Sequence, residues 1–157
     1  MLGVTLYAIT RDQDPDLAML ALTCRVIEGV NGATSIQKTL GLLWLATATG
    51  ANAPDTEGKD ALGAFLLMGQ GGGVSSIFFA VGSTLFCWLL LRGRMIPVAL
   101  AWLGVVASVL WVVGLPLQLA GVLPGAATWL MWIPMAAFEI PFALWLIIKG
   151  AALPATR

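Results

Sequence analysis

The side chain most able to do chemistry in this 157-residue sequence is a carboxylate, Glu139, inside an apolar run. The run covers residues 131–150, and Glu139 is its only charge before Lys149 closes it. Pro134 and Pro141 flank the carboxylate on either side. A charged group inside a membrane-spanning helix is costly and by default marks a functional site. The pattern therefore predicts that Glu139 serves a purpose within the membrane.

A second polar group comes from an earlier apolar segment. Arg25 and Glu28 are three residues apart, so they share one face of a helix, and Asn31 continues that face. An arginine held between Glu28 and Glu139 would have its fork of donors satisfied and would leave a net negative site. Arg25, Glu28, Asn31 and Glu139 thus form a candidate intramembrane polar site. It could bind a cation or a proton, or orient a polar headgroup.

The expected depths of these residues agree. Arg25 and Glu28 lie about 12 and 16 Å from the inner end of their helix, and Glu139 about 15 Å from the end of its own. All three fall near the middle of a hydrocarbon core about 30 Å thick. Two alternatives stay open: the polar residues could only lock two helices together, or Arg25 could snorkel at the inner interface. Lys38, beside Gln37, is expected to be a snorkelling anchor in the outer half.

Catalytic chemistry finds little support in the sequence. Histidine is absent, which removes imidazole as a metal ligand, haem ligand or general base. The two cysteines, Cys24 and Cys87, lie in apolar segments and are expected to be small buried hydrophobes. Ser75 and Ser76 have no plausible base beside them, so packing is the better interpretation. We expect no catalytic residue, no metal site and no cofactor.

The composition indicates a membrane protein. Hydrophobic residues make up 59% of the chain and charged residues only 10%, against about a quarter charged in soluble domains. Eight basic and eight acidic residues cancel, so no basic patch for nucleic acid is expected. The sequence predicts one all-α membrane domain over residues 1–157, an integral bundle of four transmembrane helices. Their expected ranges are 17–51, 61–91, 97–121 and 126–149.

Two parts of this plan depart from simple spanning helices. Residues 1–16 read as a helix remnant and a polar turn, because ten apolar residues give only about 15 Å of helix. The second expected helix contains a glycine run over residues 69–73. Gly69 and Gly73 have small-xxx-small spacing, and with Gly82 they are expected to let helices pack closely. The alternative is a hinge or a break that lines a polar cavity.

The loop charges predict an orientation. Five basic residues fall on one side and only Lys59 on the other; the five are Arg11, Arg92, Arg94, Lys149 and Arg157. The positive-inside rule then places both termini in the cytoplasm of a multi-pass cell-membrane protein, and six tryptophans fall near the two boundaries in agreement. The lipid bilayer is the expected partner. Four helices barely enclose a pathway, so a second copy or another membrane protein could complete one.

Several segments together resemble a known family. They are 25–29 (RVIEG), 76–82 (SIFFAVG), 89–97 (LLLRGRMIP) and 134–150 (PMAAFEIPFALWLIIKG). In this order they are similar to the bacterial membrane proteins grouped as domain of unknown function 4386. The resemblance implies a bacterial inner membrane and makes Arg25, Glu28 and Glu139 family marks. Its members are usually longer, with further spanning segments ahead of this start, so the chain is expected to be a short member, a late start or a truncation.

The resemblance implies no established activity, so the function is inferred from the residues. The first hypothesis is a non-enzymatic protein that binds or moves a small solute, ion or lipid near Glu139. The alternative is a structural or accessory component whose polar residues only hold helices together. An intramembrane enzyme ranks third, because base and nucleophile are both missing.

Overall fold

The computed structural model describes residues 2–50, 53–67, 73–123 and 125–151, and these residues form helices and no strand. The all-α prediction is therefore confirmed. The helices are α1 (Leu2–Thr10), α2 (Pro15–Thr47), α3 (Thr56–Leu67), α4 (Gly73–Arg92), α5 (Val98–Leu119) and α6 (Gly125–Lys149).

The turn between α1 and α2 is fixed by local hydrogen bonds. Asp14 is the N-cap of α2, and its side chain accepts a hydrogen bond of 3.1 Å from the backbone N–H of Leu17. Pro15 follows at the first helical position, where a missing N–H costs nothing. Asp14 also lies 3.6 Å from the guanidinium of Arg92 at the end of α4. The turn is thus tied to the same end of the bundle as the α4–α5 loop.

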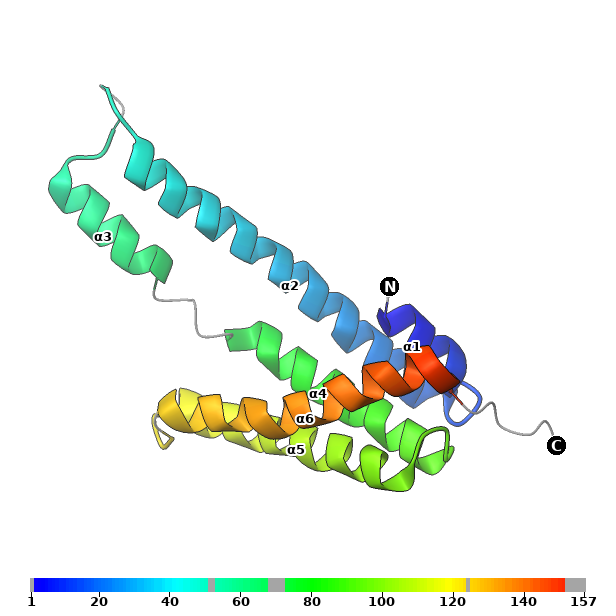
Figure 1. Cartoon of the computed structure of the whole chain (residues 1–157). Helices are drawn as coiled ribbons and strands as arrows, with labels where there is room; N and C mark the ends of the chain where they lie inside the picture. Colours follow the sequence, from blue (N-terminus) through cyan, green and yellow to red (C-terminus); the bar gives the residue numbers. More distant parts are fainter. Residues whose placement is uncertain (1, 51–52, 68–72, 124, 152–157) are drawn as a thin grey trace.

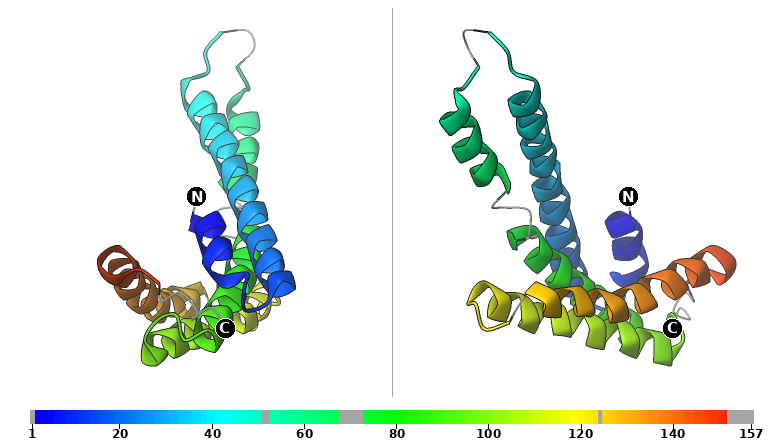
Figure 2. Two further views of the ribbon diagram at one scale, coloured as in Figure 1. Left: turned by 90° about the vertical axis from the view of Figure 1, so that its right-hand side faces the viewer. Right: turned by 60° about the vertical axis from the view of Figure 1, so that its left-hand side comes forward.

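The helices pack in a row. α2 packs along α4, α4 along α5, and α5 along α6, while α1 covers the N-terminal part of α2. The C-terminal part of α2 and the antiparallel α3 project away from α5 and α6 as a two-helix arm (Figures 1 and 2). Within the described ranges, Cα atoms of α6 lie within 8 Å of Cα atoms of α5, but not of those of α1, α2 or α4. The two ends of the row therefore do not close on each other.

Small residues set the distances between neighbouring helices. A Cβ on Gly82 of α4 would lie 3.1 Å from Cys24 Cβ and 3.3 Å from the carbonyl oxygen of Ala21, both on α2. Gly104 of α5 is equally confined, by Phe138 of α6. Of the glycine run, Gly69 lies outside the described residues, and Gly73 is the first residue of α4.

An indole hydrogen bond ties α5 to α6. Trp111 of α5, which is 2% exposed, donates from Nε1 to the carbonyl oxygen of Met131 at 3.0 Å. Its ring also meets that of Trp132 edge-on, with centroids 4.6 Å apart. The α5–α6 contact therefore combines apolar packing with a directional bond.

Three described helices are long and apolar enough to cross a membrane: Ser75–Arg92, Val98–Leu119 and Trp129–Lys149. These segments support a membrane protein, but four spans are not confirmed. The expected fourth corresponds to α2, whose 33 residues are long enough. Its apolar character is diluted by polar side chains, namely Arg25, Glu28, Asn31, Gln37 and Lys38.

Candidate functional site

A cavity of about 440 Å³ lies between the two ends of the row. Its walls come from α1, α2, α4 and α6, with Leu2 and Leu6 contributed by α1. Among the described residues, the backbone of α6 lies close to that of α5 alone, and α6 meets α4 only through side chains such as Trp132 and Phe79, which leaves this space between the helices. The volume lies within the range of about 300–1,000 Å³ that is typical of small-molecule sites.

Arg25 enters the cavity from α2 and is already well compensated. Its guanidinium makes an ion pair of 2.9 Å with Glu28, one turn further along the same helix. A long hydrogen bond of 3.5 Å joins it to Ser83 Oγ on α4, and its Cζ lies 5.0 Å from the ring centroid of Phe79. The side chains of Arg25 and Glu28 are 19% and 27% exposed. Arg25 thus links α2 to α4 and has its charge balanced within α2.

Glu139 lines the same cavity from α6 without a close cation. Among the described residues, no lysine or arginine nitrogen lies within 4.0 Å of its carboxylate. The residue is exposed, although it stands midway along a spanning candidate. The helix continues through both flanking prolines, Pro134 and Pro141, so Glu139 is presented from regular helical backbone. An accessible carboxylate at this depth is available to bind a positively charged group.

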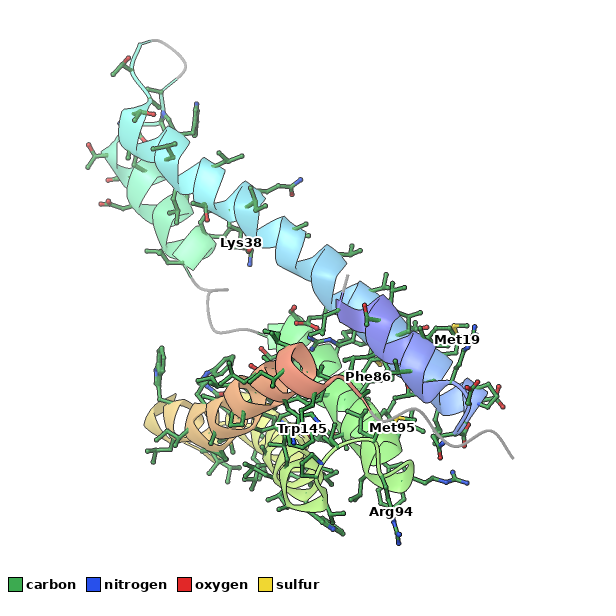
Figure 3. All side chains as sticks on the ribbon, turned by 45° about the vertical axis from the view of Figure 1, so that its right-hand side comes forward. Met19, Lys38, Phe86, Arg94, Met95 and Trp145 are labelled. Atoms are coloured by element: carbon green, nitrogen blue, oxygen red, sulfur yellow. The ribbon has the colours of Figure 1, made fainter. Side chains whose placement is uncertain are left out.

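Apolar and aromatic side chains form the rest of the wall. Phe138 and Phe142, on either side of Glu139 in α6, stack with centroids 5.1 Å apart and an interplanar angle of 14°. Phe86 lies on α4 where that helix faces α1 and the C-terminal part of α6 (Figure 3). The remaining apolar members are Phe79, Cys87, Leu90, Ala143 and Leu146. The wall of the cavity is therefore predominantly apolar, with few polar groups.

The structure brings together two of the four residues predicted for the polar site. Arg25 and Glu139 both line the cavity, although they are too far apart for an ion pair. Glu28 is held against Arg25, and neither Glu28 nor Asn31 lines the cavity. Lys38 lies in the arm, away from the cavity (Figure 3).

Other residues of the site were missed by sequence reasoning. Ser83 contacts Arg25, and its position beside Gly82, a small-residue pair in an apolar helix, was the available signal. Ser75 was expected to serve packing, and it donates a hydrogen bond of 3.2 Å to the backbone carbonyl of Glu28. Leu2 and Leu6 belong to the segment interpreted as a helix remnant, and they form one wall of the cavity. No feature of the sequence marks these two leucines.

The wall of the cavity is poor in groups that could hold a metal ion. Within the described ranges, no three cysteine, aspartate or glutamate side chains gather where they could hold a metal. The polar atoms in the cavity wall belong to one carboxylate, one guanidinium and one hydroxyl. This arrangement can recognise charge and apolar shape.

Comparison with known proteins gives a family without an activity. No curated protein and no solved structure matches the chain. A family model matches residues 1–150, and its description is "Domain of unknown function (DUF4386)". The match includes α1 and every helix that lines the cavity. The chain therefore belongs to the DUF4386 family of proteins, as the resemblance of its segments predicted.

Proposed function

We propose that this protein is a non-enzymatic, multi-pass membrane protein that binds a small molecule in the cavity between α2, α4 and α6. The observation that carries the proposal is the position of Glu139, accessible in the wall of an apolar cavity of about 440 Å³ and without an ion-pair partner in the part of the chain that the structure describes. Polar groups that line an apolar pocket are the usual basis of ligand recognition. Intramembrane carboxylates commonly mark substrate or ion pathways.

The geometry favours binding over a structural lock. A charged lock between α2 and α6 would pair Glu139 with Arg25, and the described residues form no such ion pair within 4.0 Å. Arg25 instead joins α2 to α4, two helices that already pack along each other. The carboxylate of Glu139 therefore makes no ion pair that joins α6 to the described part of α2. If the protein also transports its ligand, α6 would have to move so that the same binding site opens and closes.

The membrane topology that accompanies this function has four spans. α4, α5 and α6 are long and apolar enough to cross a membrane, and we propose α2 as the fourth. Two of the charges of α2, Arg25 and Glu28, neutralise each other, which lowers the cost of burying them in lipid. The positive-inside rule places the turn at Arg11, the Arg92–Arg94 loop and the C-terminal end of α6 on the cytoplasmic side of a bacterial inner membrane. α1 leads back from that turn into the bundle, where Leu2 lines the cavity, so the expected cytoplasmic position is proposed for the C-terminus only.

Two variants test this function. In Glu139→Gln the carboxylate is replaced by a neutral group of the same shape, and we expect the unfolding midpoint to stay within the error of the wild type. In Ala143→Phe a ring enters the cavity, and we expect native mass spectrometry of the protein, extracted in native lipid particles, to lose adducts that the wild type carries. Ala137→Phe on the same helix is the control, because Ala137 is exposed and does not line the cavity.

The results separate the two roles. A large loss of stability in Glu139→Gln would indicate a structural lock. Equal amounts of adduct on the wild type, Ala143→Phe and Ala137→Phe would mean that the cavity binds nothing, and the proposed function would be wrong.

A further inference from the structure

We infer that the occupant of the cavity is a lipophilic organic cation, a small molecule that carries one positive nitrogen on an apolar body. Glu139 is its counter-ion. This inference rests on the proposed function, because it names the ligand class of the same site.

The charges of the site select the sign of the ligand. Arg25 has Glu28 at 2.9 Å, so the positive charge in the wall is already matched. Glu139 has no such partner among the described residues. In their ionised forms the three side chains together carry one net negative charge, and the carboxylate without an ion-pair partner among them is the one that lines the cavity. An anionic ligand would meet a neutralised arginine and an unpaired carboxylate, so it is disfavoured.

The walls select the rest of the molecule. Beyond Arg25, Glu139 and Ser83, every residue that lines the cavity is apolar. Phe142 lies one turn after Glu139 on α6 and stacks on Phe138, so aromatic rings share the cavity wall with the carboxylate. A cation held by a carboxylate next to aromatic rings gains from both. A small inorganic cation is a poorer fit, because such ions require several oxygen ligands and the wall offers one carboxylate and one hydroxyl.

The depth of the carboxylate argues against a phospholipid. Glu139 is ten residues from Lys149 at the end of α6, about 15 Å of helix. A phospholipid keeps its headgroup in the interface, outside a hydrocarbon core about 30 Å thick. Its charged group would have to move to the middle of the bilayer, and its phosphate would then face Glu139. A compact amphiphilic amine brings one positive charge to this depth with no accompanying phosphate.

The experiment compares two probes of equal chain length and opposite charge, hexyltrimethylammonium and hexanesulfonate. Binding is measured by equilibrium dialysis against the protein in phosphatidylcholine nanodiscs, with empty nanodiscs subtracted to remove partition into lipid. We expect saturable binding of the cation to the wild type and about tenfold weaker binding of the anion, as expected when one charged contact is lost. Glu139→Gln should weaken cation binding by a similar factor. Asp60→Asn, which removes an exposed carboxylate of α3, should leave it unchanged.

The outcomes distinguish the inference from the function beneath it. Equal binding of both probes, stronger binding of the anion, or unchanged cation binding in Glu139→Gln would overturn the cation assignment and leave the binding site in place. If Glu139→Gln does not fold, Ala143→Phe against Ala137→Phe shows whether the cation occupies this cavity. If neither probe binds the wild type above empty nanodiscs, both the assignment and the proposed function fail.

Discussion

Gly104 of α5 is the position where one added methyl group should disturb the bundle most clearly. A Cβ there would lie 2.6 Å from Cε2 and 2.7 Å from Cζ of Phe138, and 2.7 Å from Sγ of Cys87. To reach ordinary van der Waals separation, the ring of Phe138 would have to retreat by about 0.8 Å. Phe138 is 4% exposed and its ring stacks on that of Phe142, so it has little room to move.

Two opposing effects set the size of the change. Overpacking a well-filled interior costs about 1–3 kcal/mol. Replacing glycine by alanine in a helix returns about 1 kcal/mol of helix propensity. We therefore expect Gly104→Ala to lower the free energy of unfolding by up to about 2 kcal/mol. The displaced ring of Phe138 also lines the cavity, so ligand binding should weaken as well.

The control is the same substitution in open space. Gly29 of α2 has no atom within 4 Å of its ideal Cβ, so Gly29→Ala should stabilise the helix by about 0.5–1 kcal/mol. Both variants are compared with the wild type by unfolding in detergent with increasing denaturant, followed by circular dichroism. If Gly104→Ala proves as stable as Gly29→Ala, α5, α4 and α6 are not packed as closely as the structure places them, and the reasoning is refuted.

Three further predictions concern the bundle and its orientation. Trp111→Phe removes the indole hydrogen bond to Met131 and should lower the free energy of unfolding by about 1–2 kcal/mol. Trp102→Phe, at a residue 52% exposed, should change the free energy of unfolding little. Equal effects of the two substitutions would contradict a stabilising role for this hydrogen bond. Asp14→Ala removes the N-cap of α2 and should cost about 1 kcal/mol in the same denaturant titration, while Asp12→Ala, outside the cap, should be neutral. In a background without Cys24 and Cys87, Asp60→Cys should react with an impermeant thiol reagent from outside the cell and Asp12→Cys only after lysis; the reverse pattern would invert the topology.

Local features of the site could be predicted from the sequence, because they depend on helical spacing alone. Three residues separate Arg25 from Glu28, and the structure has the ion pair that this spacing allows. An aspartate beside Pro15 at the start of an apolar run predicts an N-cap at Asp14 or Asp16, and the structure places it at Asp14. Residues 131–149 read as a spanning helix because their single internal charge hardly lowers the hydropathy of the run.

Features that depend on helix rotation and order in space could not be predicted. Equal depth suggested that Glu139 would flank Arg25, yet α6 packs on α5, and its carboxylate faces α2 across a cavity. Nothing in the spacing of Ser83, Leu2 or Leu6 indicates that these residues converge on Arg25 and Glu139. Hydropathy does not identify α2 as a span. The polar side chains of α2, Arg25 and Glu28 among them, lower its mean hydropathy, so only three described helices qualify by length and composition.

The open row of helices gives the cavity one adjustable wall. The backbone of α6 rests on that of α5 alone, so a tilt of α6 about this contact changes the width of the space without separating α2 from α4. Glu139 and Lys149 are roughly 15 Å apart along the helix, so a tilt of about 10° about Glu139 would move the end of α6 by about 2.6 Å. Such a tilt would pivot α6 about its contact with α5. Gly104 and Trp111 form part of that contact and do not line the cavity, so substitutions there would change the cavity's width from outside it.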